Sequence, residues 1–565
     1  MTDTASVKLN PVTAEIIRNA LVAITDEMKT NLMRTAYNPI IYEALDFTVG
    51  LFDENGDTMS IGLGLPMFIR GLSDAIKAKL AFYGRDGIEP GDVLLTNDAY
   101  IMGSHLNHLI FTLPIFHEGR LVAFSSSMAH WIDIGGVLGG TTQDIYSEGL
   151  QIPIVKIFKR GVQDRELTDI IRTNVRVPEL AMGDLRAQIA AIRTGERRYS
   201  ALLQKYGADT VSACVQALYT YSEKKARLAV AAMPDGEYRA ESFMDDDGVG
   251  TKPLPIAVRI VVDGDHMTID LSDVSPQVQG YFNSGETAGR SAAQVAFKCL
   301  TTPTLYPIND GSFRPLTIVL PPGRVVSALK PSAMRWWMTI PMTIADTIFK
   351  AMAQAVPKSS IAGHHADLCS VSLYGLNPRT GRFFTRSGGA GGGGFGAKYD
   401  SDGISATICL NDGDTHNSPI EASEAKVPIM IERYALRPDS GGPGRFRGGL
   451  GVEKRMRATA PISANTHTER TKCAPWGLFG GMDALPNNQH VERADGTIVQ
   501  PPNGKIDAVR LVAGDVMVVR TGGGGGFGDP RERDRAAVLR DVARGYVSRE
   551  AAVRDYGVSP EELAP

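Results

Sequence analysis

The sequence predicts an α+β protein: a large mixed chain with a helical N-terminal region and β-rich middle and C-terminal regions. Two periodicities support this class. Near the N-terminus apolar residues recur every three or four positions, as on one buried face of a helix, whereas after residue 236 apolar and polar residues alternate, as in half-buried strands. Composition agrees, because 43% hydrophobic and 22% charged residues are typical of a globular protein, and 565 residues are enough for several subdomains.

The chain opens with a predicted helix and a predicted hairpin. Within residues 11–37, Ile17, Leu21 and Ile24 recur at helical spacing. Residues 45–53 then form an apolar stretch that runs into an Asn-Gly pair at 55–56, which is a strong signal for a two-residue hairpin turn. Asp46 lies inside this apolar stretch, and a buried carboxylate needs a partner or a metal, unless Asp46 sits at an exposed strand end.

A second hairpin follows. Residues 92–96 read as a strand, and residues 109–116 and 120–124 as two strands joined by a turn at Glu118-Gly119. Residues 164–230 are predicted to be mostly helical.

The rest of the chain changes character. Strands are expected from 236 to 321, a helix over 341–355, β-structure beyond it and a polar helical tail from 530. We expect four interlocked regions that act as one functional unit: residues 1–235 with the metal site, a β-rich subdomain at 236–330, a glycine-rich mixed α/β subdomain at 331–530, and the helical tail at 531–565.

Composition excludes several protein classes. The net charge of -4 provides no basic surface for nucleic acid. The first residues lack the basic and apolar regions of a signal peptide, and no apolar run approaches the roughly 20 residues of a membrane helix. The 5 cysteines are far apart, odd in number and form no CxxC pair. We therefore expect reduced thiols in a cytoplasmic protein.

Histidines are concentrated in one part of the sequence. His105 and His108 lie in the loop before one predicted strand, and His130 lies just past the end of the next. A hairpin would bring these ends together, and several imidazoles with a carboxylate form a plausible transition-metal site. The alternative is that these are surface or core histidines with ordinary hydrogen-bond partners.

Three glycine-rich segments lie late in the chain, at 388–396, 437–451 and 522–528. Such loops can bind phosphate through backbone amides, but none matches a P-loop or a dinucleotide-binding fingerprint. Close packing of backbones explains the glycine runs at 388–396 and 522–528 better than phosphate binding does. The segment at 437–451 is interpreted as a structural turn, with contact to a partner subunit over 439–451 as the alternative.

Motifs spread along the chain resemble the hydantoinase B/oxoprolinase family. They lie at 45–47, 51–53, 96–98, 129–130, 133–136, 148–153, 174–176 and 183–185, and later at 418–421, 439–442, 447–449, 475–477 and 523–530. The resemblance runs nearly end to end. It does not choose among the reactions of the family, which include hydrolysis of cyclic amides and carboxylation of ketones.

The resemblance implies a metal site at Asp46, His105, His108 and His130. His108 stands where the family usually has Asp, Trp131 stands for a common second His, and a His often found near residue 66 is absent, with Phe68 nearby. Exchanging a carboxylate for an imidazole favours a borderline metal, so we expect one divalent ion, zinc or manganese. It could equally indicate a changed substrate or a degenerate site.

Two more carboxylates are predicted to be catalytic. Asp133 is expected to orient an imidazole ligand, and Asp98 lies in the family motif at 96–98.

The resemblance also implies a partner. No nucleotide motif is visible in this chain, which agrees with a family scheme in which ATP binds an A-type subunit. There the partner phosphorylates the carbonyl oxygen of the substrate, and the B-type subunit supplies the metal that activates water. We therefore predict a hetero-oligomeric, ATP-dependent hydrolase of cyclic amides such as hydantoins, lactams or 5-oxoproline. The alternatives are a subunit of a ketone carboxylase and a non-catalytic homologue.

Overall fold

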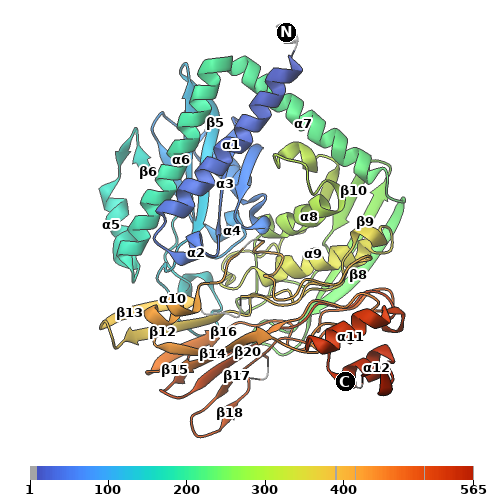
Figure 1. The fold of residues 1–565 in the computed structure, drawn as a ribbon. Coiled ribbons are helices and arrows are strands. Elements are labelled where there is room, and N and C mark those ends of the chain that lie inside the picture. The colour runs from blue at the N-terminus through green and yellow to red at the C-terminus, as the bar shows by residue number, and fades with distance from the viewer. Residues whose placement is uncertain (1–8, 388–390, 414, 502, 564–565) are drawn as a thin grey trace.

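A computed structural model of the chain describes residues 9–387, 391–413, 415–501 and 503–563. Helices and several separate β-sheets alternate along the chain, which confirms the α+β class (Figure 1). The N-terminal sheet and its helices lie at one end of the molecule, and the C-terminal sheets lie at the other (Figure 1).

The N-terminal sheet has seven strands in the order β2-β1-β5-β4-β3-β6-β7. Its strands are β1 (Phe47–Asp53), β2 (Thr58–Leu63), β3 (Val93–Thr96), β4 (His108–His117), β5 (Arg120–His130), β6 (Val155–Lys159) and β7 (Val162–Gln163). The helices of this half are α1 (Pro11–Thr35), α2 (Pro39–Tyr42), α3 (Gly71–Tyr83), α4 (Ala99–Met102), α5 (Arg165–Asn174), α6 (Pro178–Tyr206) and α7 (Ala208–Val230).

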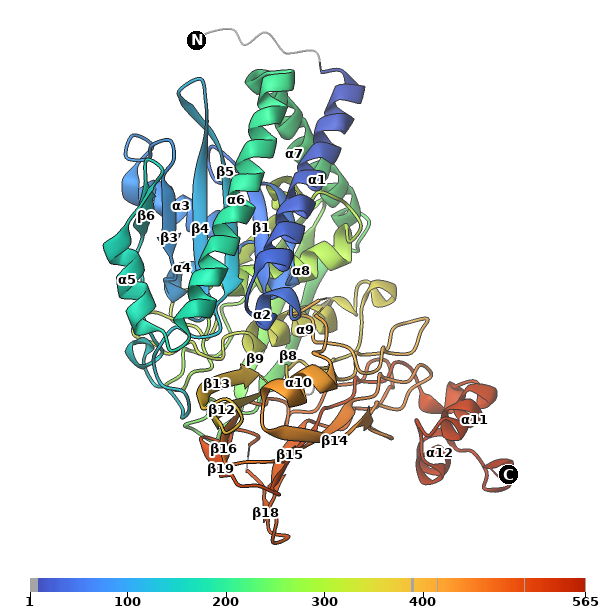
Figure 2. The ribbon, with the colours of Figure 1, turned by 60° about the vertical axis from the view of Figure 1, so that its left-hand side comes forward.

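Both faces of this sheet are covered, and strand alternation decides which side chain meets which layer. Phe47, Val49 and Leu51 of β1 point into a core shared with α1 and α6, which run side by side across one face of the sheet (Figure 2). Phe124 and Met128 of β5 point into a second core on the opposite face, where α3 packs. The central strands are therefore buried along most of their length, including the polar residues 125–127 of β5, and hold their ends in fixed positions.

The middle of the chain forms a four-stranded sheet in the order β11-β10-β9-β8. Its elements are β8 (Gly236–Met244), β9 (Leu254–Asp263), β10 (His266–Asp270), β11 (Leu316–Val319), α8 (Glu286–Thr301) and α9 (Thr339–Met352). α9 packs on β8 and β9, in agreement with the alternating burial of β9.

The C-terminal part holds two further sheets, with the orders β13-β12-β16-β19 and β14-β15-β20-β17-β18. Their strands are β12 (Val371–Asn377), β13 (Arg382–Ser387), β14 (Ile429–Leu436), β15 (Val452–Ala458), β16 (Ile462–Thr466), β17 (Asn488–Glu492), β18 (Ile498–Val499), β19 (Val509–Leu511) and β20 (Val516–Arg520). The helices are α10 (Ile420–Lys426), α11 (Arg535–Ala543) and α12 (Arg549–Tyr556).

The glycine-rich segments pack backbone against backbone. A Cβ atom added to Gly524 would lie 1.9 Å from the carbonyl oxygen of Phe395, and one added to Gly394 would lie 2.1 Å from that of Gly449. The close-packing interpretation is therefore confirmed for the described glycines; residues 388–390 of the first run lie outside the described part. In the segment 439–451, Arg447 is buried and pairs with Asp541, which favours a structural turn over a partner contact.

Most predicted helices and strands follow one another in the order that the structure shows, but their boundaries differ. The helical stretch at 164–230 is three helices, broken around Val177 and at Gly207, which has a φ of 79°. α8 lies inside the region predicted to consist of strands, so that prediction was wrong for residues 286–301. The helix predicted at 341–355 is α9, and the predicted tail contains α11 and α12.

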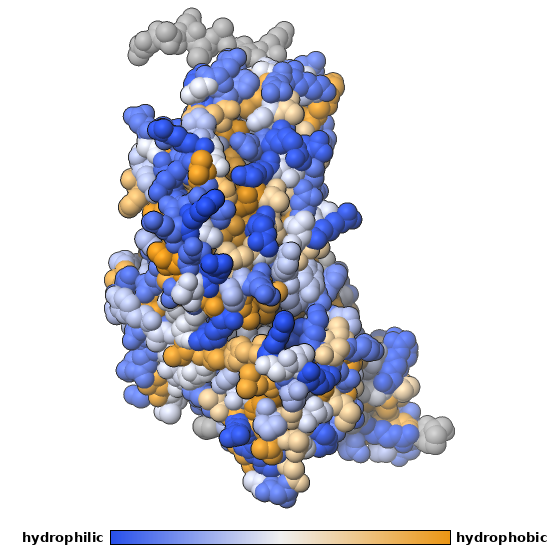
Figure 3. All heavy atoms as spheres, turned by 90° about the vertical axis from the view of Figure 1, so that its left-hand side faces the viewer, coloured by the Kyte–Doolittle hydropathy of each residue, from blue (hydrophilic) through white to orange (hydrophobic). Residues whose placement is uncertain are grey.

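The surface shows no division into wholly polar and wholly apolar faces in the view of Figure 3, where hydrophilic and apolar side chains are interleaved. Among the described helices, none combines the length and the apolarity needed to cross a membrane. All five cysteines lie in described residues, and none is in a disulfide.

Candidate metal centre

The ends of three neighbouring strands bring the predicted metal ligands together. In the antiparallel pair β4–β5, His108 at the start of β4 lies opposite His130 at the end of β5. Asp46 directly precedes β1, which pairs with β5, and its carbonyl oxygen accepts a hydrogen bond of 3.0 Å from the His130 amide. His105 lies in the loop between α4 and β4. All four side chains thus lie near the same ends of three neighbouring strands. The hairpin predicted this for the three histidines, and the family resemblance added Asp46.

The side chains form a compact cluster. The ring centroid of His105 lies 4.6 Å from that of His108 and 4.8 Å from that of His130, and the last two rings are 5.2 Å apart. The Nε2 atom of His108 lies 2.9 Å from Oδ1 of Asp46. Phe68 packs edge-on against His108 at 4.9 Å and gives the cluster an apolar wall.

Electrostatics favour the neutral form of His105 and His130 and the ionised form of Asp46. Burial lowers the pKa of His130 to about 4, and burial together with the neighbouring histidines lowers the pKa of His105 well below its ordinary value. Burial opposes the ionisation of Asp46, but His108 and His130 overcome this effect and hold its pKa below the ordinary value. Neutral imidazole and ionised carboxylate are the forms that bind metals.

Two ring nitrogens in the cluster are buried without a partner. Nδ1 of His105 lies 3.1 Å from the carbonyl oxygen of Arg335, which can only accept, so Nδ1 carries the proton and Nε2 keeps a lone pair. That Nε2 atom is buried and makes no hydrogen bond, and the same holds for Nδ1 of His130. Unpaired buried nitrogens are costly, and metal coordination is one way to satisfy them.

The imidazole and carboxylate groups are therefore of the right type to bind a divalent metal, but their ligand atoms do not converge on one point. In the part of the chain that the structure describes, no group of three or more His, Cys, Asp and Glu side chains is placed so that it could hold a metal ion. A direct hydrogen bond between Asp46 and His108 occupies two of the four predicted ligands. Metal binding stays a prediction, and a metal bound by Asp46 and His108 would have to replace the hydrogen bond between them.

The cluster forms part of the wall of a cavity of about 560 Å³. Asp46, His105 and His130 line it, together with polar groups from distant segments. These groups include Glu43, Asp133, Glu148, Arg176, Arg335, Arg386, Asp412, His416, Lys454 and His467. A cavity of this size suits a small organic substrate.

The two predicted catalytic carboxylates have other partners. Asp133 lines the cavity, but its Oδ1 accepts from the Arg176 guanidinium at 2.6 Å and its Oδ2 from the Arg176 amide. Asp98 caps α4, where Oδ1 accepts from the amide of Tyr100 at 2.9 Å, and it is not among the residues that line the cavity. The structure thus assigns Asp133 to Arg176 instead of an imidazole, and Asp98 to a helix terminus.

Sequence reasoning missed two acidic groups in the cavity. Burial and the charge of Asp46 raise the pKa of Asp412 to about 8, and burial raises the pKa of Glu148 to about 7. Glu148 accepts from the amides of Met334 and Arg335, and so it fixes the loop that contacts His105. Glu148 opens the motif at 148–153 and could have been selected; no signal marked Asp412.

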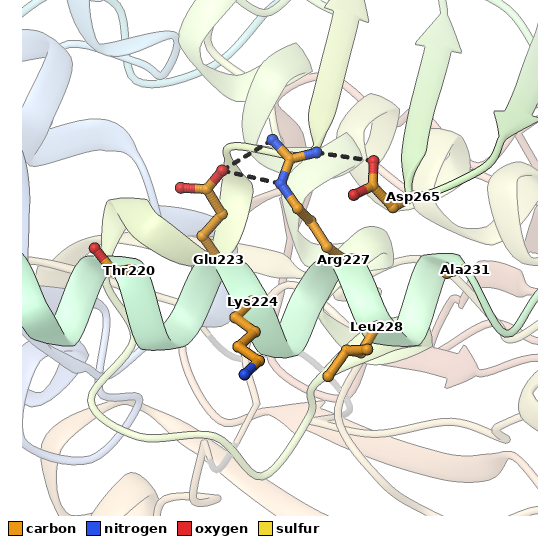
Figure 4. A pocket seen from close by; sticks show the side chains of 7 residues that line it. All are labelled: Thr220, Glu223, Lys224, Arg227, Leu228, Ala231 and Asp265. Carbon is orange, nitrogen blue, oxygen red and sulfur yellow. Dashed lines mark hydrogen bonds and ion pairs between the residues drawn. The ribbon is translucent and has the colours of Figure 1, made fainter.

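A second, shallower pocket lies against α7 (Figure 4). Three of its charged groups pair with one another, because Arg227 lies 2.9 Å from Glu223 and 3.0 Å from Asp265, and Lys224 is exposed to solvent. The pocket therefore presents no unsatisfied chemistry comparable to the histidine cluster.

Known proteins resemble this chain in sequence and in fold. The family model for hydantoinase B/oxoprolinase matches residues 10–530. The chain belongs to the hydantoinase B/oxoprolinase family.

Two sequence relatives and one solved structure are similar to this chain over nearly its whole length. A candidate B-type subunit of a D-/L-hydantoinase from Pseudomonas sp. (strain NS671) is 32% identical, with 98% of this chain and 95% of the relative covered. The beta subunit of caprolactamase from Pseudomonas jessenii is also 32% identical, with 97% and 96% covered. A crystal structure of ATP-dependent caprolactamase from that organism matches with a TM-score of 0.92 at 28% identity, covering 98% of this chain and 97% of the other.

An acetone carboxylase structure matches with a TM-score of 0.90 at 19% identity, covering 97% of this chain and 80% of that chain. At this identity the likeness shows a shared fold.

Proposed function

We propose that this chain is the ring-opening subunit of an ATP-dependent hydrolase of cyclic amides and that it works with a separate A-type subunit that binds ATP. The observation that carries the proposal is the compact cluster of His105, His108, His130 and Asp46, three of which line a cavity. Two relatives at 32% identity, with names that refer to a hydantoinase and a caprolactamase, support the substrate class. Both names also designate subunits, which supports a hetero-oligomer.

The residues that would hold a divalent metal, zinc or manganese, are Asp46, His105, His108 and His130. Such a metal, when bound, lowers the pKa of a coordinated water toward 7. The carbonyl oxygen of Arg335 orients the His105 ring, and the Asp46 carboxylate places negative charge beside His108. Phe68 and Trp337, which stack at 5.8 Å, shield the cluster from solvent on one side.

The proposed reaction balances with one ATP and two waters. On the partner, the γ-phosphoryl group is transferred to the amide oxygen, which makes the ring carbon electrophilic. In this cavity a water oxygen bonds to that carbon, the carbon–nitrogen bond breaks, and the nitrogen leaves as an amine while an acyl phosphate remains. A second water releases the carboxylate and inorganic phosphate. Asp412, with a pKa near 8, still carries a proton at neutral pH and is one group in the wall that can protonate the leaving nitrogen.

The test uses the chain co-purified with its A-type partner. The pair is incubated with ATP and a panel of lactams and hydantoins, and separately with ATP, bicarbonate and a panel of ketones, while ring-opened amine and new carboxylate are quantified by mass spectrometry. ATP-dependent ring opening supports the proposal. Turnover only in the ketone and bicarbonate set would assign the chain to the carboxylases instead, and no turnover in either set would support a non-catalytic homologue.

A further inference from the structure

One arginine in the cavity wall lacks the carboxylate partner that the others have. Of the three arginines that line the cavity, Arg176 pairs with Asp133 at 2.6 Å, and Arg386 lies 4.0 Å from Glu43. Among the described residues no carboxylate forms an ion pair with Arg335. Its guanidinium donates through Nη2 to the carbonyl oxygen of Leu138 at 2.7 Å, whereas Nη1 is buried without any hydrogen-bond partner.

The carboxylates of Glu148 and Asp507 attract this guanidinium from a distance, but among the described residues neither forms an ion pair with it. Burial lowers the pKa of His467, which lies near Arg335 in the same wall, well below its ordinary value, so that this ring is neutral. Glu148 is close, but its oxygens accept from the amides of Met334 and Arg335 and from Thr142. A buried cation with an unsatisfied N–H is costly unless an anion binds to it.

The position of Arg335 links this cation to the histidine cluster. The same residue that presents Nη1 also accepts from the His105 ring through its carbonyl oxygen at 3.1 Å. Its backbone is held by the bond of 2.9 Å from its amide to Glu148. The positive charge of the guanidinium also acts on the His105 ring. An anion bound by Arg335 would therefore lie within electrostatic reach of this candidate metal ligand, and the main chain of Arg335 is held by both its amide and its carbonyl.

We propose that Arg335 is the anion-binding group of this cavity and that it takes the phosphoryl oxygens of the activated substrate. The choice of a phosphoryl group rests on the proposed function, in which the carbon attacked beside the histidines carries that group. Guanidinium is well suited to this task, because it is permanently charged and its N–H groups match the oxygens of phosphate. In a cavity with little water the attraction is stronger than at the surface.

The experiment measures anion binding without any turnover. The full chain, treated with a chelator, is titrated with inorganic phosphate in a calorimeter, and separately with acetate at the same ionic strength. Arg335→Gln removes the charge but keeps the amide that reaches Glu148 and the carbonyl that reaches His105. Arg335→Lys keeps a charge without the guanidinium geometry. Lys426→Gln, which removes an exposed cation at the same cavity, is the matched control.

We expect saturable phosphate binding by the wild type, at least about tenfold weaker binding by Arg335→Gln, an intermediate value for Arg335→Lys and no change for Lys426→Gln. Unchanged thermal unfolding would show that the variants are folded. Equal phosphate affinity in the wild type and Arg335→Gln, or no phosphate binding by the wild type, would overturn the assignment. Acetate binding as tight as phosphate would overturn the phosphoryl choice. Because binding needs neither ATP nor partner, its outcome is independent of the turnover assay.

Discussion

Acidification of the metal-free protein should reveal whether the half-buried ring of His130 resists protonation. In the folded chain its pKa is lowered to about 4 from an ordinary value of 6.5, mainly by burial. In the unfolded chain the ring takes up a proton at the ordinary value. Between these two pH values the unfolded state therefore binds more protons, and the free energy of unfolding falls as the pH falls.

The size of this effect follows from the pKa difference. His130 contributes no penalty above about pH 7; its penalty is about 2 kcal/mol at pH 5 and about 3 kcal/mol at pH 4, because each pKa unit corresponds to roughly 1.4 kcal/mol. His130→Gln replaces the ring by a side chain that does not titrate. Its free energy of unfolding should thus fall about 2 kcal/mol less than that of the wild type between pH 7 and pH 5.

Guanidinium unfolding followed by tryptophan fluorescence at both pH values, with a chelator present, measures this difference. His117→Gln, which alters a histidine at the far end of β4, controls for the loss of a ring outside the cluster. Parallel pH dependence in the wild type and His130→Gln would show that His130 titrates as an exposed residue. That result would remove the electrostatic argument for a neutral, metal-binding ring.

Three further predictions test the metal, the partner and the packing. Elemental analysis should find about one zinc or manganese per wild-type chain and clearly less in His130→Ala; equal content in both, or none in either, would contradict the metal site. The isolated chain should release no phosphate from ATP, whereas the complex co-purified with the A-type subunit should release it. Robust ATPase activity of the isolated chain, or full ring-opening activity of a monomer, would count against the partner scheme. Gly524→Ala should abolish soluble folding, because the added Cβ would lie 1.9 Å from the carbonyl oxygen of Phe395. Gly71→Ala is the control and should fold, because its Cβ would meet only Met128, at 3.5 Å. A stable Gly524→Ala protein with the melting temperature of the wild type would refute the packing argument.

The sequence was most informative where local pattern and strand pairing determine the geometry. A hairpin places the start of one strand opposite the end of the next, so the approach of His108 to His130 followed from the strand assignments alone. α8 was missed for a physical reason: most of its residues are buried, including the polar residues Thr287, Ser291 and Gln294, so the division between apolar and polar residues does not mark an exposed face.

Arg335 and Asp412 could not be predicted, since both reach the cavity from loops whose position depends on the packing of distant sheets. A catalytic role of Asp98 stays a prediction. The residue belongs to a family motif, but a carboxylate directly before a helix is also a common N-cap, and the structure uses Asp98 in that way.

The charges in the cavity bear on the order of events. A neutral cyclic amide offers no anion to the unpaired Nη1 of Arg335, whereas its phosphorylated form does. His105, His130 and Asp46 line the same cavity, so a phosphoryl group held by Arg335 would bring the activated carbon to them and leave an unactivated substrate without an anchor. Under the proposed function the cavity would therefore select the product of the partner's ATP-dependent step, and Arg335→Gln should weaken ring opening more than it weakens phosphorylation by the partner. ADP formation that continues without ring opening in the Arg335→Gln complex is the expected result; equal loss of both steps would place Arg335 outside this selection.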